Sequence, residues 1–202
     1  MPKHEKNKFI LGITGNIACG KSTVAEMFKT KDCQLIDADC LGHELLSAGT
    51  GVYKRIIKSF GQGILRADKG IDRAKLGRVV FSNQEALVKL NGIVHPALIK
   101  KINYLIKNSN KRIVILDAAL IIEAGLRGMV DKLVVVTVKR NQQILRSKKG
   151  SGFRKGHILK RLKSQISQKE KSGFADFTID NSGSIGKTRK QVLAIRRKLW
   201  KS

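Results

Sequence analysis

Short apolar runs alternate along the chain with longer stretches in which apolar residues recur every three or four positions. The apolar runs are typical of strands buried on both faces, and they predict strands at residues 8–14, 34–39, 112–120, 132–138 and 177–180. The longer stretches predict helices between the strands. The last of these helices covers residues 185–200 and carries on one face Val192, Ile195 and Leu199. We therefore predict an α/β fold, a doubly wound parallel sheet of about five strands.

A mainly helical region separates the second predicted strand from the third. The pattern predicts helices at residues 40–49 and 72–81 and further helix at residues 83–106. Pro96 is predicted to begin a new helix, because proline fits the first turn of a helix and disrupts its interior. No repeat or low-complexity linker divides the chain, so we expect a single domain spanning residues 1–202.

The chain is strongly basic, with 41 Lys and Arg residues against 15 Asp and Glu residues and a formal net charge of +26. Such a surplus attracts polyanions such as nucleic acids, but it also occurs on solvated surfaces. Aromatic residues, on which nucleic-acid bases stack, make up only 5% of the chain. We therefore expect anionic small molecules as ligands and no obligatory nucleic-acid partner. The positive charge of the chain is larger than the binding of two small anionic ligands would require.

The composition also indicates a compartment. Apolar runs such as residues 113–116 and 133–136 are far too short to cross a bilayer, and residues 1–9 lack the features of a secretory signal. Neither a zinc site nor a disulfide framework fits the number and spacing of the cysteines, which are Cys19, Cys33 and Cys40. We expect a cytoplasmic monomer without a membrane partner. Cys19 is either a reactive thiol near a helix N-terminus or a small residue that fills a loop, and we favour the second interpretation.

Residues 15–22, "GNIACGKS", match the phosphate-loop pattern G-x-x-x-x-G-K-[ST] between a predicted strand and a predicted helix. Small residues allow backbone N–H groups to surround phosphate oxygens, and the helix N-terminus adds partial positive charge. Lys21 is expected to neutralise the β- and γ-phosphates, and Ser22 to offer its hydroxyl to Mg²⁺. The residues of this loop that are predicted to bind ATP are Asn16, Ile17, Ala18, Cys19, Gly20, Lys21, Ser22 and Thr23.

Carboxylates follow two other predicted strands. Asp37 and Asp39 stand at the end of the second strand, and Asp117 closes the third. Because ligands of open α/β sheets bind at the carboxyl ends of the strands, Asp117 is predicted to hold Mg²⁺. One carboxylate of the other pair is predicted to orient an acceptor hydroxyl and take its proton. Three alternatives stay open: Asp39 could cap a helix, Asp37 could only end a strand, and Asp117 and Glu123 could cap a turn.

Residues 139–171 have a distinct composition, with twelve Lys or Arg residues and only one acid, Glu170. The stretch lies between the fourth and fifth predicted strands and indicates two helices joined by residues 150–156. A cation-rich helical hairpin at this place predicts a lid that closes over a polyphosphate. The alternative is a solvated pair of basic helices.

Several motifs in a fixed order resemble the dephospho-CoA kinase family over residues 9–199. They are "GITGNIACGKST", "LIDADCLGHELL", "GIDRAKLGRVVF", "LNGIVHPALI", "LDAALIIEAGL" and "ADFTIDNSG". The resemblance implies a P-loop kinase with a central sheet, a helical CoA-binding region and a helical lid. It also implies transfer of the γ-phosphate of ATP to the ribose 3′-hydroxyl of dephospho-CoA, with Mg²⁺.

The resemblance assigns roles to individual residues. Asp39 would be the carboxylate that faces the acceptor hydroxyl, and His43 and Arg73 would line the acceptor site. Lid residues would be Gln143 and Arg146 on a first helix and Arg161, Gln165 and Lys171 on a second. Arg146 would offset charge in the transition state, Arg161 would bind the acceptor, and Asn181 would lie beside the ATP base. Taken singly, His43 could be a surface histidine, Arg73 could form a salt bridge at a helix start, and His95 is better explained as a structural histidine at a turn.

Two departures from the family pattern affect these expectations. Ala119, Leu120 and Ile121 stand where the family usually has Pro-Leu-Leu, so a rigid proline turn is missing. Gly150 replaces a further lid arginine, for which Lys149 or Arg154 could substitute. Lysine lacks the planar fork with which arginine clamps phosphate.

Two alternative functions remain beside that of a dephospho-CoA kinase. One is a nucleoside or nucleotide kinase of the same fold. The other is a nucleic-acid-binding P-loop protein, which the net charge suggests. The acceptor that takes the phosphate separates the first alternative from the main hypothesis.

Overall fold

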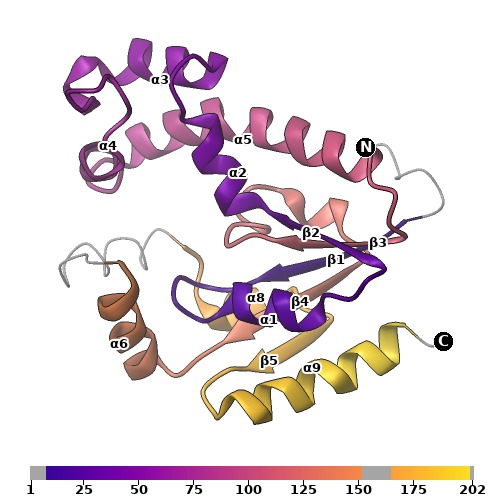
Figure 1. Ribbon diagram of the computed structural model, residues 1–202. Coiled ribbons are helices and arrows are strands. Elements are labelled where there is room, and N and C mark those ends of the chain that lie inside the picture. Colours follow the sequence, from indigo (N-terminus) through magenta and orange to yellow (C-terminus); the bar gives the residue numbers. More distant parts are fainter. Residues whose placement is uncertain (1–7, 152–164, 201–202) are drawn as a thin grey trace. The chain divides into compact units, whose positions relative to one another are not determined.

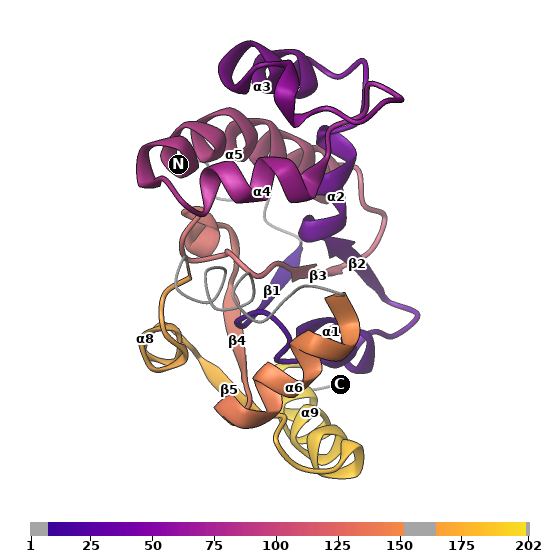
Figure 2. The same ribbon diagram turned by 90° about the vertical axis from the view of Figure 1, so that its left-hand side faces the viewer.

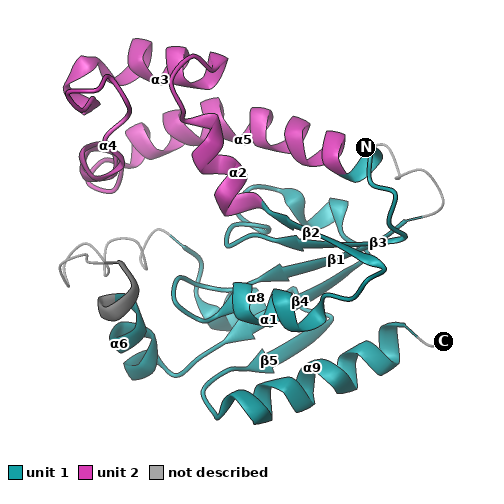
Figure 3. Ribbon diagram, viewed as in Figure 1, with its two compact units in different colours: residues 1–37, 106–202 teal, residues 38–105 magenta. Residues whose placement is uncertain are grey.

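The structure is a computed structural model that describes residues 8–151 and 165–200, with only the backbone described for residues 148–151 (Figure 1). The chain divides into two compact units, one formed by Met1–Asp37 with Ile106–Ser202 and the other by Ala38–Leu105 (Figure 3). The first unit contains the sheet, and the second is helical in nearly all of its regular structure. Each unit is described below by itself.

A five-stranded parallel sheet forms the centre of the first unit, with strand order β2-β3-β1-β4-β5. The strands are β1 (Phe9–Thr14), β2 (Cys33–Asp37), β3 (Ile113–Asp117), β4 (Lys132–Thr137) and β5 (Phe177–Asp180). This confirms the predicted doubly wound sheet of five strands. Because β1 is the middle strand, the loop that follows it leaves the carboxyl edge at the centre of the sheet.

The register of the strands brings polar residues to that edge. Asp37 at the end of β2 is paired with Asp117 at the end of β3, and Asp117 is paired in turn with Ile13 near the end of β1. Residue 15, where the phosphate-loop motif begins, follows directly after β1. The two aspartates and the start of the motif therefore lie at the same edge of the sheet, as the strand pattern predicts.

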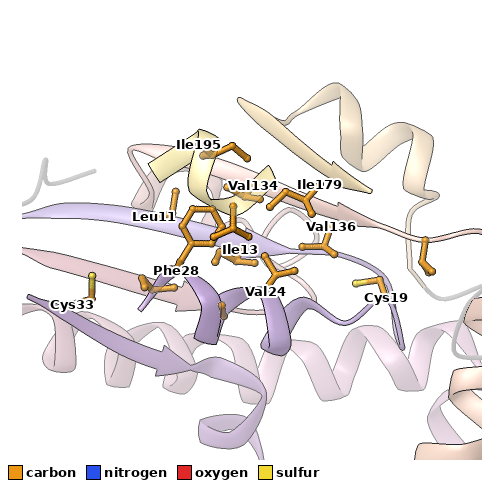
Figure 4. Close-up of a cluster of buried hydrophobic side chains, with 14 residues drawn as sticks. Leu11, Ile13, Cys19, Val24, Phe28, Cys33, Val134, Val136, Ile179 and Ile195 are labelled. Carbon is orange, nitrogen blue, oxygen red and sulfur yellow. The ribbon is translucent and has the colours of Figure 1, made fainter. Parts of the chain in front are cut away.

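Helices α1 (Lys21–Phe28) and α9 (Ile185–Leu199) pack against each other and cover one face of the sheet. Figure 4 shows their apolar side chains meeting those of the strands, with Phe28 and Ile13 fully buried. Val192 and Ile195 are buried in the same cluster, which confirms the predicted apolar face of the last helix. Burying one such large apolar side chain contributes about 2 kcal/mol to folding, so this cluster holds α1, and with it the phosphate loop, on the sheet.

Two further helices of the first unit follow β4. Helix α6 (Arg140–Ser151) is the first predicted lid helix. The short helix α8 (Gln168–Gly173) begins with a capping box formed by Ser167 and Glu170 and lies across β5 from α9 (Figure 2). Gln168 fixes α8 to the end of β4, because its side chain accepts a hydrogen bond from Val138 N at 2.8 Å and donates one to Val138 O at 3.0 Å.

The second unit has its own apolar core, built by four helices and a short 3₁₀ helix. They are α2 (Ala38–Leu45), α3 (Gly51–Phe60), η1 (Gln62–Ile64), α4 (Arg73–Val80) and the first 22 residues of the 24-residue helix α5 (Gln84–Lys107). The helices predicted at residues 40–49 and 72–81 correspond to α2 and α4.

The prediction that Pro96 begins a new helix is wrong, because Pro96 lies inside the continuous helix α5. Its ring removes one backbone hydrogen bond of the helix. Apolar residues on both sides of the proline pack into the same core, among them Leu90, Ile93 and Ala97. This packing keeps the two halves of α5 in one helix despite the missing bond.

Candidate active site

The phosphate-loop motif connects β1 to α1, and its two glycines are fixed by close contacts. A Cβ atom on Gly15 would lie 2.5 Å from both the Sγ atom of Cys19 and the backbone oxygen of Val136. Gly20 has a φ of +86°, and a Cβ atom there would collide with the side-chain amide of Asn181. Side chains at either position would displace the loop, so the geometry requires glycine at both.

The N-terminus of α1 has the form of an anion site. Gly20 is its N-cap, no described side chain caps the helix, and its first turn contains no acidic residue. Ala18 adds a second left-handed backbone conformation, with a φ of 60°. Backbone N–H groups at such a turn and helix start point toward a common centre, where the helix dipole favours negative charge.

Lys21 connects this loop to the end of β3. Its Nζ atom lies 3.1 Å from Oδ1 of Asp117 and 3.5 Å from Oγ of Ser22. The Asp117 side chain is only 1% exposed. An ionised carboxylate at that depth requires a paired cation, and Lys21 supplies it.

The Ser22 hydroxyl and the Asp117 carboxylate fit Mg²⁺. A hydroxyl and a carboxylate are hard oxygen ligands of the kind this ion takes, and an ammonium group already lies against both. Within the described ranges, no cluster of three or more His, Cys, Asp or Glu residues could hold a metal ion. Ser22 and Asp117 therefore suit an ion that takes its remaining ligands from phosphate and water.

A buried asparagine supports the loop from the other side. Asn181, which follows β5, donates from Nδ2 to the backbone oxygen of Cys19 at 2.9 Å and accepts from Thr188 Oγ1 at 2.8 Å. Arg146 on α6 donates to the Asn181 backbone oxygen at 3.0 Å, and its Nη1 atom lies 3.8 Å from the position a Cβ on Gly20 would take. The structure thus brings Arg146 and Asn181 to the loop. That Asn181 lies beside the ATP base and that Arg146 acts on the transferred phosphate stay predictions.

The part played by Thr188 was not predicted from the sequence. Thr188 is fully buried in α9 and orients the Asn181 amide, so that both polar atoms of that side chain are bonded within the protein. No local signal marks it, because a threonine near a helix start is common. Its partner, Asn181, comes within hydrogen-bond distance only when α9 packs against the sheet.

Two glutamines hold the backbone of Ile17, the third residue of the motif. Gln143 on α6 donates to the Ile17 backbone oxygen at 2.9 Å, and Gln165 accepts from the Ile17 N–H at 3.0 Å. In addition, Asn16 donates from Nδ2 to the backbone oxygen of Ile166 at 2.9 Å. The predicted lid residues Gln143 and Gln165 therefore contact the loop through its backbone.

Lys171 differs from a solvated lid cation. It lies in α8 with its side chain fully buried, and its Nζ atom donates to the Ala119 backbone oxygen at 2.6 Å. The same atom is 2.9 Å and 3.1 Å from the two carboxylate oxygens of Glu123. Arg161, predicted on the second lid helix, and Arg154 lie outside the described residues.

Burial explains the chemistry of Cys19. It is 1% exposed, and desolvation of the thiolate raises the pKa of its thiol from 9.0 to about 11. The thiol is therefore protonated and unreactive near neutral pH, which supports the interpretation as a residue that fills the loop. No disulfide forms within the described part of the chain, which includes all three cysteines.

The predicted acceptor residues lie in the second unit. Asp39 is in the first turn of α2, and His43 is one turn further along the same helix, so the two side chains share a helical face. Arg73 is the first residue of α4 and is exposed. The cap of α4 is Asp72, whose side chain accepts from Ala74 N and Lys75 N, and these bonds hold its pKa below the usual value.

His95 does not lie at a turn, contrary to the sequence interpretation. It is a half-buried residue in the middle of α5, next to Pro96. Burial disfavours the charged imidazolium and lowers the pKa of His95 below 6.5.

No described helix is long and apolar enough to cross a membrane.

The parallel sheet and the phosphate loop at its carboxyl edge define a P-loop protein of the kinase type. The chain belongs to the dephospho-CoA kinase family, whose sequence profile matches residues 9–187. The match covers both units, from β1 into α9.

Individual relatives agree over nearly the whole length. The dephospho-CoA kinase of Carboxydothermus hydrogenoformans is 42% identical over 195 residues, which cover 95% of this chain and 94% of that protein. A crystal structure of a Thermus thermophilus protein superimposes with a TM-score of 0.80 at 28% identity, covering 96% of this chain and 99% of the other. Dephospho-CoA kinase from Campylobacter jejuni gives a TM-score of 0.66 at 28% identity, with 95% and 97% covered.

Proposed function

We propose that the protein transfers the γ-phosphate of ATP to the 3′-hydroxyl of dephospho-CoA and releases CoA and ADP, the last step of coenzyme A synthesis. The observation that carries this proposal is a complete, well-supported phosphate loop in a chain that belongs to the dephospho-CoA kinase family. A nucleoside or nucleotide kinase of the same fold is not favoured by the family match, nor is a nucleic-acid-binding P-loop protein.

The loop holds the ATP phosphates. The N–H groups of Ile17 and Cys19 donate within the protein, to Gln165 Oε1 and to the Asn16 backbone oxygen. Other backbone N–H groups of residues 16–23 would surround the β- and γ-phosphates, and Lys21 would turn its ammonium group from Asp117 toward them. Ser22 and Asp117 would hold Mg²⁺, which would supply positive charge against the phosphates. Arg146, whose guanidinium group already lies against Gly20, offsets the charge that develops on the transferred group.

Asp39 orients the acceptor and receives its proton. The 3′-oxygen forms a bond to the γ-phosphorus, the bond from that phosphorus to the bridging oxygen breaks, and ADP leaves with the electron pair. The proton of the hydroxyl passes to the Asp39 carboxylate. Only one residue separates Asp39 from Asp37, which ends β2 at the edge where Asp117 lies, and this supports its assignment as the base.

The remaining predicted residues bind the anionic acceptor. His43 shares a helical face with Asp39, and Arg73 begins α4 with its side chain exposed. We assign both, together with Arg161, to the phosphate and ribose groups of dephospho-CoA. A guanidinium group, as in Arg73 and Arg161, forms two parallel hydrogen bonds to phosphate, and the imidazole of His43 can form a hydrogen bond to a phosphate or ribose oxygen. We assign residues 139–171 to a lid whose far end, at Gln168 and Lys171, is fixed to the sheet. We place the protein in the cytoplasm as a monomer with no obligatory nucleic-acid partner.

The experiment that tests the proposal is an acceptor screen. Purified protein is incubated with Mg²⁺ and ATP labelled at the γ-phosphate, and offered in separate reactions dephospho-CoA, nucleosides, nucleoside monophosphates or no acceptor. We expect label only in the dephospho-CoA reaction, in a product that comigrates with CoA. Label on a nucleoside or nucleoside monophosphate and none on dephospho-CoA would overturn the proposal in favour of the first alternative. Salt-sensitive RNA binding without phosphate transfer would favour the second alternative.

A further inference from the structure

A buried ion pair lies at one side of the phosphate loop and takes no part in the chemistry proposed above. Lys171 on α8 is fully buried, and Glu123, in the loop between β3 and β4, is 16% exposed at its side chain. Lysine is almost never fully buried unless it is paired. Replacing such a pair by apolar groups is often neutral or stabilising, so stability alone is a weak reason for its presence.

The pair is connected to the loop by a short series of hydrogen bonds. Glu123 Oε1, held by Lys171 at 2.9 Å, accepts from the backbone N–H of Ile166 at 3.2 Å. The backbone oxygen of Ile166 accepts from Asn16 Nδ2 at 2.9 Å. The preceding residue, Gln165, accepts from the N–H of Ile17 at 3.0 Å. Residues 165–166 are thus bonded to Glu123 on one side and to the phosphate loop on the other.

Hydrogen bonds also connect Gln168 and Lys171 on α8 to residues at the carboxyl edge of the sheet. Gln168 fixes the start of α8 to Val138 at the end of β4. Lys171 also donates to the Ala119 backbone oxygen, which accepts a second bond, at 3.1 Å, from Thr14 Oγ1 at the end of β1. The Lys171 ammonium group therefore has a fixed position relative to the strand from which the loop departs.

We propose that Glu123 and Lys171 are positioning residues for ATP binding, which hold residues 165–166 against Asn16 and Ile17 and so fix the phosphate loop in its binding conformation. The inference rests on the proposed function, because it assigns the loop to ATP. Neither residue needs to contact ATP. Their effect passes through three hydrogen bonds within the described part of the first unit, from Ile166 N–H to Glu123, from Asn16 to Ile166 and from Ile17 N–H to Gln165. Misplacement of a binding group by about 1 Å is enough to cost about a hundredfold in rate.

The test uses Lys171→Met, Glu123→Met, which removes the oxygen that accepts from Ile166 N–H, and the double variant that carries both changes. Each single change leaves a buried charge or carboxylate without its partner, so each is expected to lower the unfolding temperature. The double variant removes both charges, and we expect its unfolding temperature to return to within about 4 °C of wild type. A positioning role predicts that ATP binding does not return with it. The dissociation constant for Mg²⁺–ATP, measured by calorimetry, should stay at least about tenfold above that of wild type in all three variants.

Glu26→Met is the matched control. It makes the same chemical change in an exposed ion pair, with Lys29 at 3.5 Å, on α1 itself. We expect its unfolding temperature and ATP affinity to equal those of wild type, because exposed pairs contribute little. In the three test variants the KM for dephospho-CoA should change by less than about threefold, since the acceptor does not bind to the phosphate loop.

Amide hydrogen exchange gives a second readout that needs only folded protein. Below the unfolding temperature of each variant, the amides of Ile17 and Ile166 should exchange faster than in wild type, while the amide of Ile13 in β1 should not. Wild-type ATP affinity in the stable double variant, or unchanged exchange at Ile17 and Ile166, would overturn the inference. Failure of the wild-type protein to phosphorylate dephospho-CoA would instead refute the proposed function, because neither readout involves the acceptor.

Discussion

The ammonium nitrogen of Lys21 lies 3.1 Å from Oδ1 of Asp117, a carboxylate that is 1% exposed at the carboxyl end of β3. The lysine of the phosphate loop thus holds a carboxylate as its partner in the structure described here. In the proposed mechanism, ATP binding exchanges these partners: phosphate oxygens take the Lys21 ammonium group, and another cation takes the Asp117 carboxylate. This exchange explains why nucleotide and Mg²⁺ should bind together.

Substitution of Lys21 tests that exchange. Lys21→Ala removes the ammonium group from the phosphates and leaves Asp117 buried without it, so ATP affinity and turnover should both fall, turnover by about a hundredfold or more. Stability should also fall, by about 3 kcal/mol, since one partner of a buried pair is lost. Equilibrium ATP binding and chemical unfolding measure the two effects. Lys29→Ala, at an exposed lysine that follows α1, is the control; unchanged ATP affinity in Lys21→Ala would contradict the loop assignment.

Substitution of Asp39 tests the acceptor side. Asp39→Asn keeps the size of the side chain but removes the proton acceptor, so kcat should fall by about 10²-fold to 10⁴-fold. The KM for ATP should change by less than about threefold, because the phosphate loop is intact. Steady-state kinetics with both substrates varied separate these effects, and Asp32→Asn, at an exposed aspartate, should leave both constants unchanged. Full turnover in Asp39→Asn would remove Asp39 from the mechanism.

Thr188 offers a test of the support behind the loop. Thr188→Val removes the hydroxyl that donates to Asn181 Oδ1 at 2.8 Å and leaves that buried oxygen without the bond. The free energy of unfolding should fall by about 1 to 3 kcal/mol. The KM for ATP should rise by severalfold, because the Asn181 amide no longer has a fixed orientation toward Cys19 O. Thr178→Val, at an exposed position in β5, is the control. A rise in KM equal to that of the control would show that Asn181 holds the loop without help from Thr188.

The pKa of Cys19 predicts how its thiol reacts and how stability depends on pH. With the pKa raised to about 11, only about 0.1% of the thiol is ionised at pH 8, so iodoacetamide should modify the exposed Cys40 long before Cys19. The raised pKa stabilises the folded state below pH 9, and this contribution is lost as the pH rises from about 9 to about 11.

The difference between wild type and Cys19→Ala isolates that contribution. Because the burial of the neutral thiol in the folded state raises the pKa by about two units, wild type should lose about 2 to 3 kcal/mol relative to the variant across this range. Chemical unfolding at several pH values measures it. Parallel pH profiles of the two proteins, or rapid alkylation of Cys19 in the folded state at pH 8, would contradict the buried position of the thiol.

The sheet could be predicted from the sequence because its signal is local. Runs such as residues 113–116 and 133–136 are apolar at every position, which is typical of short strands covered on both faces. The phosphate loop could be predicted for a similar reason, since its glycines, lysine and serine are contiguous. The edge at which Asp37 and Asp117 meet followed from the rule that parallel strands end on the same side.

The supports of the loop could not be predicted, because they join residues that lie far apart in the sequence. Thr188 acts on Asn181, Gln165 on Ile17 and Lys171 on Glu123. Each pair forms only when separate elements are packed together, and no spacing rule connects them. Lys171 is also a case in which composition misleads, since its basic surroundings indicate a solvated cation and the fold buries it.

Pro96 shows how tertiary packing overrides a local preference. Its ring disfavours the interior of a helix by about 3 kcal/mol, which is why the sequence indicates a break. Partly buried apolar residues of α5 on both sides of Pro96, among them Ile93 and Ala97, pack into the core of the second unit. Their burial favours the continuous helix that the structure shows. The sequence thus shows that Pro96 disfavours a helix at this position, but it does not show whether packing in the core keeps the helix continuous.

The central claim is that the phosphate of ATP is transferred to the ribose 3′-oxygen of dephospho-CoA. The measurement that tests it most directly is phosphorus NMR of the product formed from Mg²⁺–ATP, dephospho-CoA and the wild-type protein. We expect one new phosphomonoester resonance coupled to the ribose H3′ proton, appearing in step with ADP, and at least about 10²-fold more slowly with Asp39→Asn. A phosphomonoester on any other oxygen, or ADP formation with dephospho-CoA left unchanged, would contradict it.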